Sequence, residues 1–171
     1  MSLPLYRHDP EPTLATEGNR GLWYNRFFNR YGADWMIPDT GKPQWVSENA
    51  GRTGQDAALE AQALRQLALI TALGGRGAVF ETDWHFATGL GLPHPVENGL
   101  AWHHTLGVPY LAGSGVKGLV RAWVEVWDES LNVEEKARRS ICWFGDLQQA
   151  GQFRFFDALP VEPVMPSICP W

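Results

Sequence analysis

The chain has 171 residues, of which 44% are hydrophobic and 19% charged, and its formal net charge at pH 7 is −5. This length corresponds to about one domain with a core of its own, and the acidic balance argues against a general nucleic-acid binder, which usually carries a basic domain. No apolar run approaches the ~18 residues of a membrane span, and the N-terminus lacks a basic patch followed by an apolar core, so we expect neither a membrane partner nor a secretory signal. With only Cys142 and Cys169, the sequence has neither a disulfide framework nor a four-cysteine zinc site. We therefore expect a cytoplasmic protein with reduced thiols and no bound metal or cofactor.

Arginine and aromatic residues stand out in this composition. Eleven of the fourteen cations are arginine, and the chain has nine tryptophans. Arginine together with aromatic rings is typical of surfaces that stack on bases or pack against protein partners. We expect the chain to act together with a partner.

Residues 1–54 are interrupted by many prolines and glycines, which predicts an irregular N-terminal arm before a domain over 55–171. Within the arm, residues 19–31 are rich in aromatic and arginine side chains, and this pattern indicates one short helix. The residues expected to face inward from that helix are Leu22, Phe27 and Tyr31.

A longer helix is predicted over 55–73, with Thr53 as its N-cap, Asp56 completing a capping box, and Gly74-Gly75 ending it. The period then changes to two over 80–86, which predicts a strand with one buried face. Glu81, Asp83 and His85 share the polar face of that strand. Because alternate residues of a strand lie nearly 7 Å apart, at a rise of ~3.3 Å per residue, a solvated polar face is favoured over a metal site.

Two further helices and a second strand follow a long loop. A helix is predicted over 115–128, with Ser114 as its N-cap. A second helix is predicted from an Asn132 N-cap to about Trp143, with Glu135 three residues after the cap. A strand over 152–159 follows. The residues of the apolar stripe expected on the first of these helices are Val116, Leu119, Val120, Trp123 and Trp127. The element order predicts an α+β fold, although two strands do not make a self-sufficient sheet.

The glycine-rich segment before that helix holds the most chemistry. Gly113, Gly115 and Gly118 satisfy G-x-G-x-x-G, but no buried strand precedes them. The acids at the distance a dinucleotide fold needs, Glu134 and Glu135, lie in a helix opening and not at a strand end. A P-loop is also excluded, because Lys117 is flanked by valine and glycine. A helix N-terminus with small residues still suits an anion, and Lys117 with Arg121 adds positive charge there. The alternative is a tightly packed, capped helix start without a ligand.

The stretch from Phe86 to Ala122 resembles the RAMP superfamily of CRISPR-associated proteins, whose mark is a glycine-rich loop of Gly-Ser-Ser-apolar-Lys-Gly type before a helix. Phe144-Gly145 and the strand ending Phe156-Asp157-Ala158 match as well. Asn19 to Tyr24 resembles the start of the family of the sixth subunit of the type III-B (Cmr) effector complex. Gly115 departs from the pattern, because it stands where the family prefers a second serine.

The resemblance implies an RRM-like, ferredoxin-like fold with an N-terminal helical extension. The family continues with further strands and a helix where this sequence stops, so we expect the domain over 55–171 to be incomplete. The resemblance also implies a non-catalytic subunit in antiviral defence that binds CRISPR guide RNA toward its 3′ end. Such a subunit contacts the guide–target RNA duplex and packs against other RAMP subunits of the Cmr complex. The candidate RNA-binding residues are Gly113, Ser114, Gly115, Val116, Lys117, Gly118, Arg121, His94 and Arg20.

Two other functions fit parts of the sequence. One is a metal- or histidine-dependent ribonuclease, since imidazoles and carboxylates supply acid–base or metal chemistry. Its candidate residues are Glu81, Asp83, His85, His103 and His104. The other is a purely structural assembly subunit whose tryptophan-rich faces bind protein and never RNA.

Overall fold

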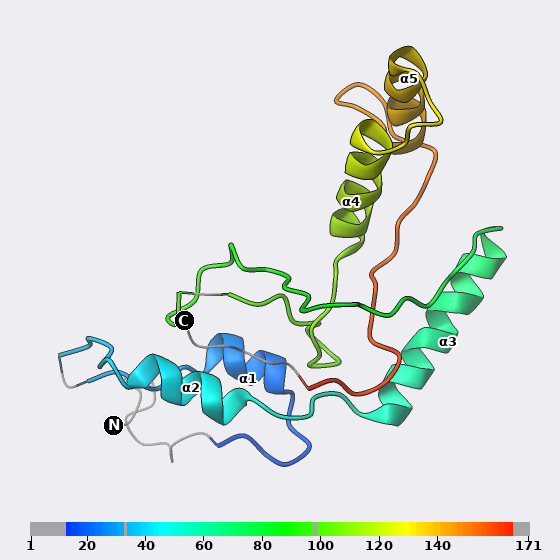
Figure 1. Ribbon diagram of the computed structural model, residues 1–171. Coiled ribbons are helices and arrows are strands. Elements are labelled where there is room, and N and C mark those ends of the chain that lie inside the picture. Colours follow the sequence, from blue (N-terminus) through cyan, green and yellow to red (C-terminus); the bar gives the residue numbers. More distant parts are fainter. Residues whose placement is uncertain (1–12, 33, 98, 166–171) are drawn as a thin grey trace. The chain divides into compact units, whose positions relative to one another are not determined.

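The computed structural model describes residues 13–32, 34–97 and 99–165. They form two compact units, a larger one of the described residues up to 110 together with 159–165, and a smaller one of residues 111–158. The larger unit therefore takes in residues on both sides of position 54, where the sequence analysis placed a domain boundary. Its helices are α1 (Arg20–Arg26), α2 (Gly41–Asn49) and α3 (Asp56–Ala72), and those of the smaller unit are α4 (Gly113–Val126) and α5 (Val133–Phe144) (Figure 1).

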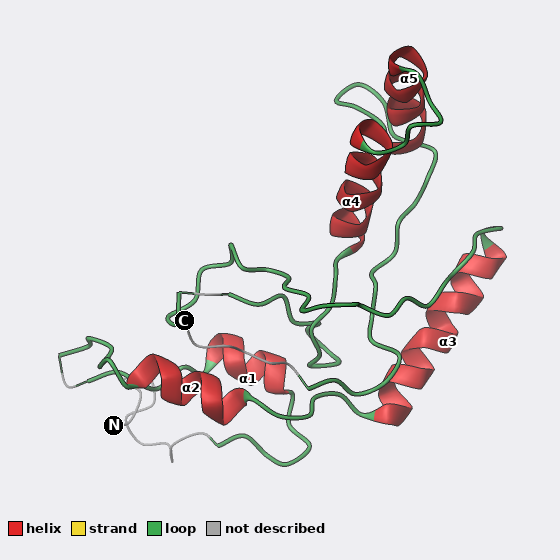
Figure 2. Cartoon of the chain, viewed as in Figure 1, coloured by secondary structure: helices red, strands yellow, loops and turns green. Residues whose placement is uncertain are grey.

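Outside these helices the described chain is loop, and it contains no strand longer than a single bridge (Figure 2). The four isolated antiparallel bridges are Thr53–Val164, Trp102–Pro109, Leu111–Ala158 and Gly145–Ala150. The strands predicted over 80–86 and 152–159 are thus absent, and the α+β prediction is not confirmed. The physical reason is that a strand exists only beside a neighbour that accepts and donates its backbone hydrogen bonds.

Helix α1 confirms the short helix predicted in the arm, but a different face is buried. Asn19 caps it, since the Asn19 side chain accepts a hydrogen bond of 2.8 Å from the Leu22 amide. Tyr24 is fully buried, whereas Leu22, predicted to face inward, is 46% exposed. The helix ends at Arg26, so the residues after it do not continue the helical spacing on which that prediction relied.

Aromatic rings make the core of the larger unit. Trp45 of α2, which was not predicted as helical, is 1% exposed. The Trp45 ring lies edge-on to Phe28 at 5.4 Å between centroids and also contacts Tyr24 at 6.3 Å. The buried members of this core are Tyr24, Phe28, Trp45, Val46, Val96 and Trp102.

Helix α3 confirms the helix predicted over 55–73 to within a residue at each end, but not its cap. Its N-cap is Gln55, without a side-chain hydrogen bond, while Thr53 is buried and its backbone pairs with Val164. Of the residues in α3, only Leu59 is fully buried. Although α3 has 17 residues, no helix in the described part of the chain is long and apolar enough to cross a membrane.

Helices α4 and α5 pack on one another around Val124, Leu131 and Phe144. The capping box at the start of α5, between Asn132 and Glu135, is present as predicted. The apolar stripe predicted on α4 is partly wrong. Val124, which is not a member of that stripe, is the α4 residue buried in the contact with α5. Three members of that stripe are exposed: Leu119 by 64%, Trp123 by 54% and Trp127 by 70%.

Candidate functional site

The glycine-rich segment is the first turn of α4 rather than a loop before it. The helix begins at Gly113, its N-cap is Ala112, and no side chain of the cap residue bonds to it. The prediction that Ser114 caps this helix is therefore wrong, since Ser114 is its second residue. The Gly113 amide instead donates a hydrogen bond of 2.6 Å to the Asp157 carboxylate.

Asp157 changes the electrostatics expected from the sequence, which has no acid between Asn98 and Arg121. The fold brings this carboxylate to the positive end of α4, where an anion is favoured. Sequence reasoning missed the contact because 44 positions separate the two residues. The Phe156-Asp157-Ala158 match to the family pattern was the available signal, but it indicated a strand end and not a cap.

The three glycines of the pattern have different surroundings. A Cβ atom on Gly113 would lie 2.5 Å from the Phe155 carbonyl oxygen, and one on Gly115 would lie 2.7 Å from Leu111 Cδ1. A Cβ atom on Gly118 would meet nothing within 4 Å. The first two glycines are therefore needed for packing within the unit, whereas the exposed Gly118 faces open space.

The two cations of α4 are not equivalent. Arg121 Nε donates to Glu125 Oε1 at 2.8 Å, and Ser140 Oγ donates to the same oxygen at 2.8 Å. The hydrogen bond from Arg121, and then that from Ser140, hold the pKa of Glu125 below its usual value, so this carboxylate stays ionised and neutralises Arg121. Lys117 has no hydrogen bond or ion pair with any described residue.

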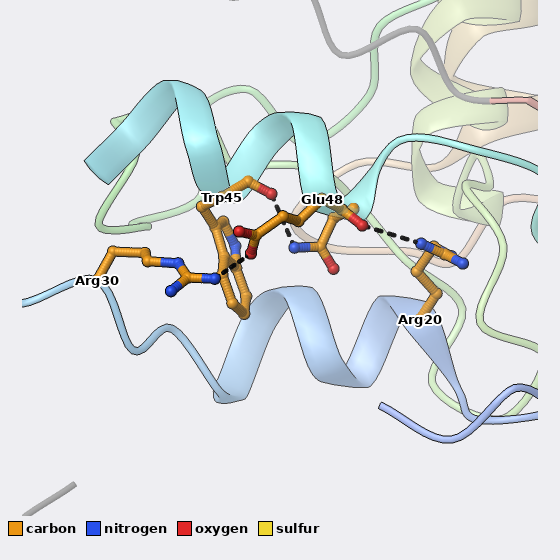
Figure 3. A network of polar contacts seen from close by, with 5 residues as sticks. Arg20, Arg30, Trp45 and Glu48 are labelled. Atoms are coloured by element: carbon orange, nitrogen blue, oxygen red, sulfur yellow. Dashed lines mark hydrogen bonds and ion pairs between the residues drawn. The ribbon is translucent and has the colours of Figure 1, made fainter. Parts of the chain in front are cut away.

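Arg20 lies in the larger unit and binds protein there. Its guanidinium donates to the carbonyl oxygens of Glu48 at 3.3 Å and Ala50 at 3.4 Å, at the C-terminal end of α2. Figure 3 shows Arg20 and Arg30 reaching toward Glu48, with Arg30 paired to the carboxylate. Arg20 therefore supplies donors to helix carbonyls that have no partner inside the helix.

His94 also lies in the larger unit, against the aromatic core. Its ring stacks on Tyr24 at 4.4 Å between centroids, and its Nε2 lies 2.8 Å from the Tyr24 carbonyl oxygen. His94 Nδ1 accepts a hydrogen bond of 3.2 Å from the Val96 amide, so the proton of the neutral ring is on Nε2. Both ring nitrogens are engaged within the unit.

A sequence model of the RAMP superfamily matches residues 78–164, just over half of the chain. The chain belongs to the RAMP superfamily. It is thereby a CRISPR-associated protein with an RNA-binding role, as the broader resemblance implied, while the likeness to the sixth Cmr subunit stays a prediction. No curated protein and no solved structure matches the chain. The matched residues of this RAMP protein include α4, α5, Asp157 and His94, whereas Arg20 precedes them.

The acidic and histidine residues considered for catalysis form no metal-binding group in the described part of this RAMP protein. There, no three or more His, Cys, Asp or Glu side chains are grouped so as to hold a metal ion. Glu81, Asp83 and His85 are exposed along one segment. His103 Nδ1 instead accepts a hydrogen bond of 3.3 Å from the Leu106 amide within a turn. Of the two thiols, Cys142 is free and half-buried, and Cys169 lies outside the described residues.

The surroundings of His94 predict that the larger unit loses stability in acid. Burial lowers the pKa of His94, against the smaller opposite effect of its bond to the Tyr24 carbonyl. The unfolded chain then binds the proton more tightly than the folded one. The contribution of neutral His94 is therefore complete above the unfolded pKa of ~6.5 and decreases as pH falls through the lower folded pKa.

Urea denaturation at a series of pH values, compared between the wild type and His94→Gln, measures this effect. We expect the free energy of unfolding of the wild type to fall more steeply below pH ~6.5 than that of the variant. Parallel curves for the two proteins would show that His94 does not contribute to the pH dependence.

Proposed function

We propose that this RAMP protein is a non-catalytic RNA-binding subunit of a type III-B (Cmr) CRISPR effector complex. In this proposal, the first turns of α4 contact the backbone of the guide RNA toward its 3′ end, near the guide–target duplex. Other surfaces of the protein pack against neighbouring RAMP subunits. Guide base pairing then reads the target sequence, and the protein holds backbone and shape.

The observation that carries the proposal is Lys117 beside Gly118 at the start of α4. Lys117 is a cation without a protein partner among the described residues, and Gly118 leaves open space next to it. A phosphate that approaches here gains the charge of Lys117, while the Asp157 carboxylate already occupies the positive end of the helix at Gly113. This local patch offers a way for a chain of net charge −5 to bind RNA.

The same geometry ranks the candidate residues. Lys117, Gly118 and the exposed Ser114 lead the proposed contact, and Arg121 is secondary because Glu125 neutralises it. His94 and Arg20 already have protein partners, so in this proposal they support the fold of the larger unit. The non-catalytic assignment is supported by the scattered placement of the histidines and acids described above.

Charge variants of α4 test the contact through the salt dependence of RNA affinity. Lys117→Ala should weaken binding to every sequence alike and reduce the slope of log affinity against log salt by about 0.7–1. Glu125→Gln should strengthen binding, because it releases the charge of Arg121 while an amide still accepts from Ser140. The measurement is guide-RNA affinity of the assembled complex at several salt concentrations.

Lys136→Ala is the matched control, since Lys136 belongs to α5 and donates to the Glu125 carbonyl at 3.4 Å. We expect its salt slope to equal that of the wild type. Equal slopes for Lys117→Ala, Glu125→Gln and the wild type would remove α4 from the RNA interface and favour the structural-subunit alternative. If the RNA is cleaved during the titration and His103→Ala abolishes this cleavage, the non-catalytic assignment is contradicted.

A further inference from the structure

Residues 79–86 of the larger unit form an exposed apolar segment. Val79 is 76% exposed, Phe80 is 88% exposed and Trp84 is 81% exposed, and Phe86 is more than half exposed as well. Four large apolar side chains are therefore exposed within eight residues, and exposed apolar side chains gathered in this way mark an interaction site.

No described residue pairs with the backbone of this segment, although both of its ends are attached to the unit. Residues 76–87 make no backbone hydrogen bond with any described residue. Before the segment, the Gly75 amide donates to the Ile70 carbonyl at 2.8 Å, and after it the Thr88 carbonyl accepts from Ala101 at 2.9 Å. A tethered row of free amides and carbonyls is the template that a further strand pairs with.

The side-chain pattern of the segment suits pairing with a strand. Phe80, Trp84 and Phe86 alternate with Glu81, Asp83 and His85, so an extended backbone separates an apolar face from a polar one. The chain bends at Asp83 and Trp84. No backbone hydrogen bond from a described residue holds this bend, so it can straighten when a partner strand arrives.

The charge of the polar face distinguishes between the possible partners. Glu81 and Asp83 repel phosphate, which disfavours stacking of RNA bases on the neighbouring aromatic rings. A protein strand with lysine or arginine opposite the two acids gains attractive cross-strand pairs, each of about 0.2–1 kcal/mol. A second copy of the segment would bring further acids to the same face.

We propose that residues 79–86 are a strand-addition site for the sheet edge of a partner protein. The partner strand carries apolar residues that cover Phe80, Trp84 and Phe86, and lysine or arginine residues opposite Glu81 and Asp83. This inference goes beyond the RNA contact proposed at α4, because its residues lie in the other unit and its ligand is protein.

The test uses the full chain and a synthetic peptide of about eight residues in which lysine and valine alternate. Peptide affinity is measured by fluorescence anisotropy, and the site of binding by amide hydrogen exchange. We expect the peptide to slow exchange over residues 79–86 and not in α4. A peptide in which glutamate replaces each lysine should bind at least about tenfold more weakly.

Two substitutions of Thr82, which is exposed, provide a matched pair. Thr82→Pro removes a backbone donor and should weaken peptide binding by about tenfold. Thr82→Val keeps the donor and favours a strand, so its affinity should equal or exceed that of the wild type. Thermal unfolding should be the same for both variants, since Thr82 makes no hydrogen bond with any described residue.

Three results would overturn the proposal. One is equal peptide affinity of Thr82→Pro and Thr82→Val, which would show that no strand pairing occurs. Another is slow exchange of amides 79–86 in the protein without peptide, which would show that this chain or a second copy already pairs with them. The third is protection of the segment by single-stranded oligouridine and not by the lysine–valine peptide, which would assign it to RNA.

Discussion

Replacing Trp45 with alanine is expected to lower the free energy of unfolding of the larger unit by about 3–5 kcal/mol. Trp45 is 1% exposed and touches Trp23, Tyr24 and Phe28, so its loss leaves a cavity at the centre of the aromatic core. Its indole nitrogen has no hydrogen-bond partner in the described structure, so the loss is one of packing alone. The effect is large because α1 and α2 meet through this ring.

Urea denaturation followed by circular dichroism measures the change, and hydrogen exchange assigns it to α1 and α2. Trp84→Ala is the matched control, because Trp84 is 81% exposed and its replacement should change stability by less than about 0.5 kcal/mol. Equal losses for the two variants would mean that the aromatic core does not stabilise the larger unit.

Opposite effects are expected from alanine at two glycines of the same motif. Gly113→Ala would place Cβ 2.5 Å from the Phe155 carbonyl oxygen. The neighbouring backbone cannot yield easily, because Leu111 and Ala158 exchange hydrogen bonds of 3.0 and 2.8 Å. We therefore expect Gly113→Ala to destabilise the smaller unit by about 1–3 kcal/mol.

Gly118→Ala should stabilise α4 by about 0.5–1 kcal/mol, because its Cβ has open space and alanine is the better helix former. If RNA approaches the backbone at Gly118, as proposed, the bulkier Gly118→Leu should weaken RNA binding while the helix stays folded. Thermal unfolding and RNA affinity, measured on all three variants, separate packing from binding. Unchanged RNA affinity of Gly118→Leu would argue against close approach at this residue.

Local signals in the sequence predicted α3 and α5 well. The capping box of Asn132 and Glu135 spans three residues, and the two glycines after α3 act within one turn. Such interactions form between neighbours in the chain, whatever the rest of the molecule does. The position of the glycine-rich segment at a helix start was predictable for the same reason.

The predicted strands depended on neighbours that a local pattern does not specify. Alternation over 80–86 indicates a residue pattern able to form a strand, but the hydrogen bonds of a strand come from another segment. In the described chain that other segment is absent, and the apolar face remains exposed. The alternating pattern therefore indicates that residues 80–86 are able to form a strand, but it does not indicate that a partner strand is present.

By itself, the sequence determined helices α3 and α5, the helix start at the glycine-rich motif and the resemblance to the RAMP superfamily. Only the tertiary structure decided which candidate residues are free to act. It placed Asp157 on the Gly113 amide across 44 positions and stacked His94 on Tyr24 across 70. Lys117 remained without a partner among the described residues. Helix signals act between residues within a turn or two, whereas the availability of a side chain depends on groups that are distant in sequence and meet only on folding.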